Sequence, residues 1–298
     1  MPSSWGKQIS VALMAASGCV TVGCVMAGCA ETPASSTYVA WTEMAMFDQR
    51  SSAQPMRDIG GRTPDEGFIV DFTLGYDDRS QILSNWFMDA GWLKADFSPH
   101  NVRFDKTGMT LAVTPRRGGP TPYVGAEFQR NGFYGFGRYE VVMRAARAQG
   151  VVSSFFTHTG DYFGDKHSEV DFEFVGSRTT EVHTDYFWDG RSDALDVPLW
   201  FDVSEDLHLY AFEWLPDSIA WYVDGIQIRR VETATATAPI PQTSARVMAN
   251  IWAATEHAVE WVGEAAGPGG SAVYRCMSHV PDGRSGPQCS DSFTPPAR

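Results

Sequence analysis

Short runs of alternating hydrophobic and polar residues recur along the chain from about Phe68, separated by glycine, proline or aspartate. Successive side chains of a β-strand point to opposite faces, so this alternation predicts half-buried strands. We predict strands over residues 109–114, 137–144, 151–157, 169–175, 181–187, 207–214, 219–223, 226–231 and 246–252. Asp224-Gly225, between two of them, is typical of a two-residue hairpin turn. No segment shows a sustained helical period, so the pattern predicts an all-β sandwich or barrel.

The same pattern divides the 298-residue chain into four parts. Residues 1–29 resemble a secretory signal peptide. Residues 30–66 are rich in Ala, Ser, Thr, Pro and Gly, which is typical of a tether. Residues 67–281 carry the predicted strands and are numerous enough for one sizeable core. Residues 282–298 form a C-terminal tail.

The first segment indicates export from the cytoplasm. Lys7 precedes an apolar run that extends to about Val25, and the run contains Ser, Thr, Gly and Cys, which disfavours a retained transmembrane helix. Met26-Ala27-Gly28-Cys29 resembles a bacterial lipobox, which predicts lipidation of Cys29 and a cell-envelope lipoprotein. The resemblance of Ala30 to a sorting residue indicates the outer membrane if the organism is Gram-negative. The alternative is cleavage nearby and secretion without lipid.

The cysteines agree with an exported chain. Cys19 and Cys24 leave with the signal peptide, and Cys29 is the predicted lipid carrier. Cys276 and Cys289 remain as an even pair in an oxidising compartment, which predicts a disulfide. Their spacing lacks the CxxC form of a zinc or redox site, and no His/Cys cluster in the sequence suggests a catalytic metal.

Composition narrows the class of partner. A hydrophobic fraction of 43% with 20% charged residues excludes a disordered or fibrous chain. The net charge of -13 repels phosphate backbones, so we predict no nucleic-acid partner. A neutral polysaccharide is not repelled, and aromatic residues, 13% of the chain, often stack against flat ligands. We predict a polysaccharide substrate, no cofactor, and membrane contact only through the lipid anchor.

One strand carries most of the candidate chemistry. Residues 167–174 alternate so that Glu169, Asp171 and Glu173 share one face, while the intervening apolar side chains share the other. The Cα atoms of Glu169 and Glu173 lie ~13 Å apart in a strand, and inclined side chains bring the carboxyls to about 5–6 Å. Retaining glycosidases hold a nucleophile and an acid/base carboxyl about 5–5.5 Å apart.

Crowding of these acids predicts unequal proton affinities. Three neighbouring carboxyls do not all ionise easily, so at least one pKa rises, as a general acid near neutral pH requires. Asp171 lies between the two glutamates and can hold a proton there. A solvated acidic face is the alternative, and the alternation by itself supports both interpretations equally.

Residues 127–263 resemble glycoside hydrolase family 16, especially its licheninase-like members. The resemblance lies in the Glu169-x-Asp171-x-Glu173 motif and in the segments YGFGRYEVVMRAA, GVVSSFFTHTG, EVHTDYF, LHLYAFEWLPDSIAWYVDG and VMANIWAATEHAVEWVG, which occur in the family's order. It implies a concanavalin A-like jelly-roll β-sandwich with a concave substrate cleft. It also implies that Glu169 is the nucleophile, Asp171 an assisting residue and Glu173 the acid/base of a retaining double displacement.

Residues around the acids are candidates for substrate contact. On the next predicted strand, His183 and Asp185 are placed to bind sugar hydroxyls and Phe187 to stack on a ring. The resemblance adds four candidate positions, Glu127, His167, Asn250 and Trp252.

Positions 129, 167 and 275 are among those that depart from the family's pattern. Gln129 stands where the family usually has the basic partner of the acid at position 127, and Arg130 is displaced by one residue. His167 stands where licheninases usually have Trp. Arg275 stands where many relatives place a calcium-binding Asp, so we predict no calcium there.

The leading hypothesis is therefore an endo-acting β-glucan hydrolase, with β-1,3-1,4-glucan as the favoured substrate. The enzyme alternatives are an exopolysaccharide depolymerase or a transglycosylase of the same family. The alternatives from other classes are a non-catalytic carbohydrate-binding sandwich and a structural envelope lipoprotein.

Overall fold

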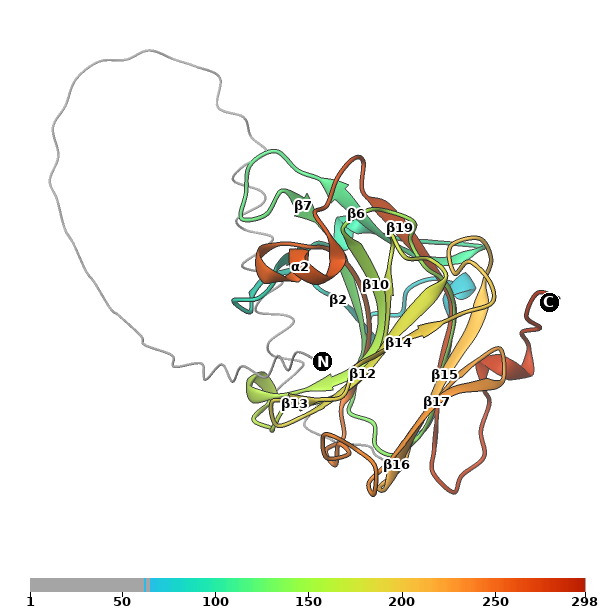
Figure 1. Ribbon diagram of the computed structural model, residues 1–298. Helices are drawn as coiled ribbons and strands as arrows, with labels where there is room; N and C mark the ends of the chain where they lie inside the picture. The colour runs from blue at the N-terminus through green and yellow to red at the C-terminus, as the bar shows by residue number, and fades with distance from the viewer. Residues whose placement is uncertain (1–61, 63–64, 298) are drawn as a thin grey trace, which may run out of the picture.

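Two large antiparallel sheets stack face to face in the part of the chain that the computed structural model describes, Arg62 and residues 65–297 (Figure 1). The back sheet runs in the order β17 (Ile226–Glu232), β16 (Ser218–Val223), β15 (His208–Trp214), β9 (Gly137–Arg144), β19 (Gly270–Pro281), β6 (Gly108–Pro115) and β5 (Val102–Asp105), with β1 (Phe68–Asp71) on β19 and β7 (Tyr123–Val124) on β6. The front sheet runs in the order β13 (Arg191–Ser192), β12 (Glu181–Trp188), β11 (Ser168–Val175), β10 (Val151–Thr159), β18 (Arg246–Ala253), β8 (Ala126–Arg130) and β2 (Gln81–Leu83), with β14 (Leu195–Pro198) on β12.

Short elements complete the sandwich. A separate hairpin pairs β3 (Trp86–Asp89) with β4 (Lys94–Phe97). The short helices are η1 (Phe72–Leu74), η2 (Pro99–Asn101), η3 (Asp161–Phe163), η4 (Glu256–Ala258), α2 (Val259–Val262) and η5 (Cys289–Asp291). Within the described range, no helix has the length and apolar character needed to cross a membrane.

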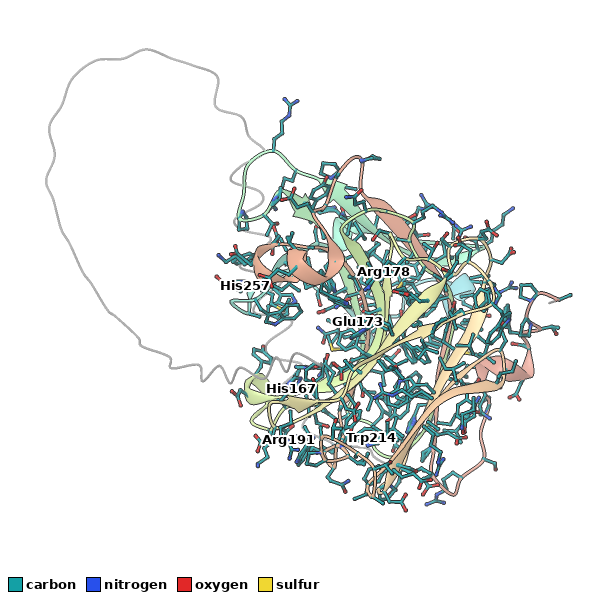
Figure 2. All side chains as sticks on the ribbon, in the orientation of Figure 1. His167, Glu173, Arg178, Arg191, Trp214 and His257 are labelled. Carbon is teal, nitrogen blue, oxygen red and sulfur yellow. A yellow bond between two sulfur atoms is a disulfide. The ribbon has the colours of Figure 1, made fainter. Side chains whose placement is uncertain are left out.

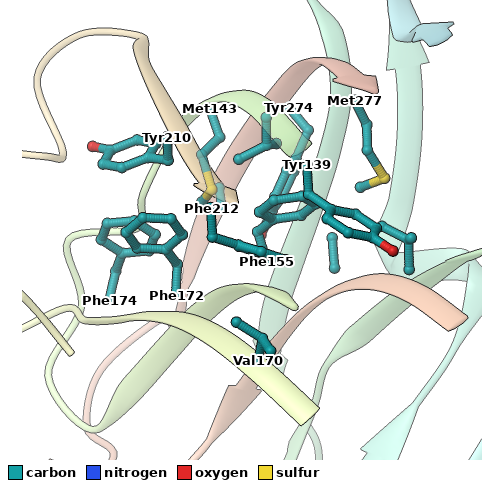
Figure 3. Packing of buried hydrophobic residues seen from close by; sticks show 14 of the residues in the cluster. Tyr139, Met143, Phe155, Val170, Phe172, Phe174, Tyr210, Phe212, Tyr274 and Met277 are labelled. Atoms are coloured by element: carbon teal, nitrogen blue, oxygen red, sulfur yellow. The ribbon is translucent and has the colours of Figure 1, made fainter. Parts of the chain in front are cut away.

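The core lies between the two sheets and is rich in aromatic rings (Figure 3). The front sheet contributes Phe155 and Phe172, and the back sheet contributes Tyr139 and Phe212, all fully buried. The rings of Tyr139 and Phe212 stack with centroids 4.9 Å apart, and Phe155 lies 5.5 Å from Phe212. Burial of large apolar surfaces and favourable ring contacts therefore hold the sheets together.

The all-β prediction is confirmed, and each of the nine predicted runs is a strand of one of the two sheets. Strand β19 was not predicted, although it is the central partner of β9 and β6. Its pairing with β9 shifts register between Tyr274 and Cys276, and such a bulge interrupts the alternation of side chains. Strand β8 was also not predicted, and its polar residues Glu127 and Gln129 are buried rather than exposed.

The N-terminal predictions lie mostly outside the described residues. The predicted signal peptide, Cys29 and the tether up to residue 61 belong to that part of the chain. Arg62 is described, and it forms an isolated bridge with Phe133, donates to the carbonyl of Ser244 at 2.8 Å and pairs with Asp165. The chain therefore contacts the sandwich four residues before the predicted end of the tether at residue 66.

A disulfide joins Cys276 of β19 to Cys289 of η5, the pair suggested by the sequence. The half-cystines pack in a small apolar cluster with Val142 and Leu209 of the back sheet. The backbone N–H of Ser290 donates to the buried carboxylate of Glu140 at 2.9 Å. The segment after β19 is therefore fixed on the outer side of the back sheet.

We expect the Cys276→Ser/Cys289→Ser double variant to lose about 3 kcal/mol of unfolding free energy, because the bond closes a short loop and restricts the unfolded chain. Urea unfolding of the oxidised wild type, the reduced wild type and the double variant measures this loss. A midpoint equal in all three samples would show that the disulfide contributes nothing to the stability of the fold.

Candidate active site

The register of the front sheet brings the acidic strand and most of the predicted site residues into adjacent rows on its outer face. The first row contains Phe187, Glu169, His158 and Arg246; the second contains Asp185, Asp171, Phe156, Met248 and Gln129; the third contains His183, Glu173, Ser154, Asn250 and Glu127. Figure 2 shows His167 and Glu173 on the side of the sandwich that also carries His257. Residues far apart in the sequence therefore form one polar surface.

The core fixes the direction of the acidic strand. Val170 and Phe172 are fully buried between the sheets, as their alternation with the acids predicts. The indole N–H of Trp221, from the back sheet, donates to the backbone carbonyl of Asp171 at 3.0 Å. The hydroxyl of Tyr274 donates to the carbonyl of Ser154 on the neighbouring strand at 2.9 Å. These contacts hold the carboxyls of β11 on the outer face.

Two histidines contact the first acid of the strand. Nδ1 of His158 lies 3.2 Å from Oε2 of Glu169, and Nε2 of His167 contacts the same oxygen. Burial opposes ionisation of Glu169, but the charges and hydrogen bonds of the two imidazoles outweigh it and lower its pKa to about 2. The ring of His167 stacks on Phe187, with centroids 4.9 Å apart. Glu169 is therefore held as a carboxylate.

The other two acids of the strand favour the protonated form. Burial, followed by the charges of Glu169 and Asp185, raises the pKa of Glu173 to about 8. Burial and the charges of Glu169 and Glu173 raise the pKa of Asp171 well above its usual range. Burial also raises the pKa of Asp185 to about 7, although two backbone N–H groups donate to its carboxylate. The predicted inequality of proton affinities is thus present on this strand.

Glu127 lies in a buried polar network rather than beside a basic residue of its own strand. Its Oε1 accepts from Ser84 at 2.6 Å, from Gln129 at 2.9 Å and from the indole of Trp86 at 3.3 Å. Arg130 lies over the ring of Phe68 and does not replace the missing base. The nearby positive charge comes instead from Arg246, which donates to Gln129 at 3.2 Å.

The remaining predicted residues differ in their surroundings. Asn250 is buried, and its Oδ1 accepts from Ser154 at 2.5 Å. Nδ1 of His183 lies 2.6 Å from Oδ1 of Asp196, and burial lowers the pKa of this histidine despite the carboxylate. Trp252 is only 4% exposed and packs in a second apolar cluster, so its ring is mainly a packing group in this structure.

An aromatic wall beside the acids was missed by the sequence reasoning. The β3–β4 hairpin exposes Trp86, Phe87 and Trp92, and the ring of Trp92 meets Trp252 edge to face at 6.2 Å. From α2, the ring of Trp261 lies 4.7 Å from His183. The high aromatic content was the available signal, but each run is too short to show a period.

Asp171 is buried, and Glu169 and Glu173 are partly exposed. A cavity of about 370 Å³ is lined by residues such as Phe136, Trp214 and Gln242, and no acid of β11 borders it. His158, His167 and Glu169 are the one group of nearby side chains, among the described residues, that offers a metal three ligand atoms. The absence of calcium near Arg275 stays a prediction.

Comparisons with known proteins agree with this arrangement. The model of glycosyl hydrolases family 16 matches residues 90–269. A β-glucanase of Acetivibrio thermocellus is 36% identical over 226 residues, which is 72% of this chain. The chain spans 65% of the length of that relative.

Solved structures extend the similarity to the fold. A prokaryotic β-1,3-1,4-glucanase (lichenase) derived from a mouse hindgut metagenome has a TM-score of 0.67 and 32% identity, covering 72% of this chain and 99% of its own. A Bacillus licheniformis β-glucanase has a TM-score of 0.65 and 31% identity, covering 74% and 99%. The predicted jelly-roll sandwich is therefore confirmed.

We expect Glu169→Gln to lower the pKa of Glu173 from its value of about 8, because the substitution removes a negative charge that disfavours a second carboxylate. A ¹³C NMR titration of the glutamate carboxyls measures this shift. Asp196→Asn is the matched control, because it removes a carboxylate that pairs with His183 instead. An unchanged or higher value in Glu169→Gln would contradict the proposed charge coupling.

Proposed function

Because the chain belongs to family 16 of the glycosyl hydrolases, we propose that it cleaves internal linkages of a β-glucan, with β-1,3-1,4-glucan as the favoured substrate. The observation that carries the proposal is the pair of glutamates on one strand face, one held ionised and the other held protonated. Two carboxyls with opposite protonation states are what acid-assisted glycoside cleavage requires. The relatives named above are β-glucanases, which supports this class of substrate.

In the first step, a carboxylate oxygen of Glu169 attacks the anomeric carbon, and the bond to the leaving sugar breaks. Glu173 gives its proton to the glycosidic oxygen, so the leaving chain departs as a neutral alcohol. The product is a glycosyl ester of Glu169. In the second step, Glu173 takes a proton from water, the water oxygen attacks the same carbon, and the ester bond breaks. Two inversions give net retention.

The charge coupling assists the change of role of Glu173. While Glu169 is a carboxylate, its charge raises the pKa of Glu173 and keeps Glu173 protonated. Once Glu169 is an ester, that charge is gone, and the proton affinity of Glu173 falls as it must act as a base. Asp171 assists between them, and its high pKa lets it hold a proton there instead of adding a third negative charge.

The surrounding side chains provide a surface suited to a sugar chain. We assign the exposed rings of Trp86 and Trp92 to stacking on pyranose faces, with Phe187 and His167 on the opposite side of the acids. The polar groups of the third row, Glu127, Asn250 and His183, and the neighbouring Asp185 are assigned to sugar hydroxyls. Trp252 supports the aromatic wall from below.

We expect the wild type to release short oligosaccharides from mixed-linkage β-1,3-1,4-glucan, and Glu169→Gln and Glu173→Gln to be slower by about 10³-fold or more. Chromatography of the released sugars measures both rates. Glu232→Gln, which changes an exposed acid of the back sheet, is the control with unchanged activity. Equal products from wild type and Glu169→Gln would mean that β11 is not the catalytic strand.

Azide separates the two glutamate roles when the substrate is an activated aryl β-glycoside. Glu173→Ala forms the ester without acid help, so azide replaces water and gives a β-glycosyl azide. Glu169→Ala lacks the nucleophile, so azide attacks directly and gives the α-product. The reverse pattern would exchange the two assignments.

Other outcomes with polysaccharides identify the alternatives. Longer products on addition of an acceptor oligosaccharide would indicate a transglycosylase. Cleavage of xyloglucan, a β-1,3-glucan or a bacterial exopolysaccharide in place of mixed-linkage glucan would change the substrate but keep the mechanism. Sugar binding without hydrolysis, unaffected by Glu169→Gln, would indicate a carbohydrate-binding protein.

We also propose export and lipidation at Cys29, on the basis of the signal-like segment and lipobox and of a disulfide that suits an oxidising compartment. The full chain expressed in a bacterium should incorporate labelled fatty acid and sediment with membranes, and Cys29→Ser should do neither. Release of an unlabelled wild-type chain into the medium would instead indicate simple secretion.

A further inference from the structure

The proposed nucleophile Glu169 and two neighbouring histidines together present three atoms that could bind a metal ion. Nδ1 of His158, Nε2 of His167 and an oxygen of Glu169 all lie within 4.8 Å of one another. They come from the end of β10, the residue before β11, and β11 itself. The sequence predicts no metal site, because His158 stands nine positions before His167 and the spacing alone does not show that the two residues meet. The sheet register brings them together, since His158 lies directly opposite Glu169.

We propose that His158, His167 and Glu169 bind a divalent transition-metal ion, with Zn²⁺ as the best match, and that this ion inhibits the enzyme. Two imidazole nitrogens and one carboxylate oxygen are ligands that Zn²⁺ prefers. Ca²⁺ and Mg²⁺ prefer sets made entirely of oxygen atoms, so the same trio discriminates against them.

The spacing of the donors suits a small tetrahedral ion. Zinc–nitrogen and zinc–oxygen bonds of about 2.0–2.1 Å place neighbouring ligand atoms roughly 3.3 Å apart. Nδ1 of His158 lies 3.2 Å from Oε2 of Glu169, which already matches this edge. His167 contacts the same oxygen, and withdrawal of its ring from Oε2 would admit the ion.

Access and support for the ion are also present. The side chains of His158, His167 and Glu169 are 33%, 34% and 19% exposed, so an ion reaches them from the open face. That face leaves a fourth position for water or a sugar oxygen. The stacked ring of Phe187 already orients His167, and the strand pair orients His158 and Glu169, so little side-chain freedom is lost on binding.

The ion would inhibit the enzyme because it takes an electron pair of the Glu169 carboxylate. This consequence rests on the proposed function. A carboxylate oxygen of Glu169 bound to Zn²⁺ no longer attacks the anomeric carbon. The ion also stands on the sheet face where the sugar must lie. Zinc should therefore compete with the glucan, raising KM more than it lowers kcat.

Calorimetric titration of the purified full chain with ZnCl₂ in a chelator-free buffer tests the site directly. We expect one Zn²⁺ per chain, and binding at least about tenfold weaker in His158→Phe, His167→Phe and Glu169→Gln. His257→Ala is the matched control, because His257 pairs with Glu260 on the surface but has no third ligand atom. Cobalt substitution should give the visible bands of a tetrahedral centre in the wild type and not in these three variants.

Failure of the site and failure of the proposed function are distinguishable. Zinc binding without glucan cleavage would keep the site and overturn the hydrolase, whereas glucan cleavage without zinc binding would do the reverse. Equal zinc binding by the wild type and Glu169→Gln would place the ion elsewhere and overturn the proposal. Glu169→Gln keeps the size of the side chain, so it remains informative even if a histidine variant does not fold.

Discussion

The alternation of β11 between core and surface is the constraint on which the rest of the site depends. Val170 and Phe172 are buried between the sheets, and the indole of Trp221 holds the backbone at Asp171. Because each strand residue points opposite to its neighbours, burying one set forces the acids onto the outer face. A shift of one residue would bury three carboxyls in an aromatic core, so the packing that stabilises the fold also determines which face carries the acids.

This geometry places three carboxyls close together, and their different surroundings give them different proton affinities. Glu169 receives two imidazoles and stays ionised, whereas Glu173 and Asp171 receive burial and negative neighbours and hold their protons. The chemical difference between two identical side chains thus comes from their surroundings, which include His158 on the neighbouring strand and the other acids of β11. Phe187 supports this difference indirectly, since it orients His167.

The sequence predicted the features that depend on residues close together in the chain. The alternation of residues in β11 predicted that the acids share one face. Asp224-Gly225 predicted a hairpin, and it joins the paired strands β16 and β17. The sequence did not show which distant residues lie side by side in the fold. His158 and Arg246 lie at the site because of how the strands pair. The strands of the β3–β4 hairpin are too short to show a clear alternation in the sequence. The bulge of β19 also breaks the pattern on which strand prediction relies.

The same contacts explain why the proposed nucleophile and a proposed metal ligand coincide in this chain. An imidazole that donates its N–H to a carboxylate stabilises the negative charge, and an imidazole without that proton presents a lone pair at the same point. A proton and a metal ion therefore compete for one location between His158, His167 and Glu169. An aromatic ring in place of His167 would offer a sugar a stacking surface but no ligand. In the proposed site, the histidines that keep Glu169 ionised thus also make it a ligand for transition metals.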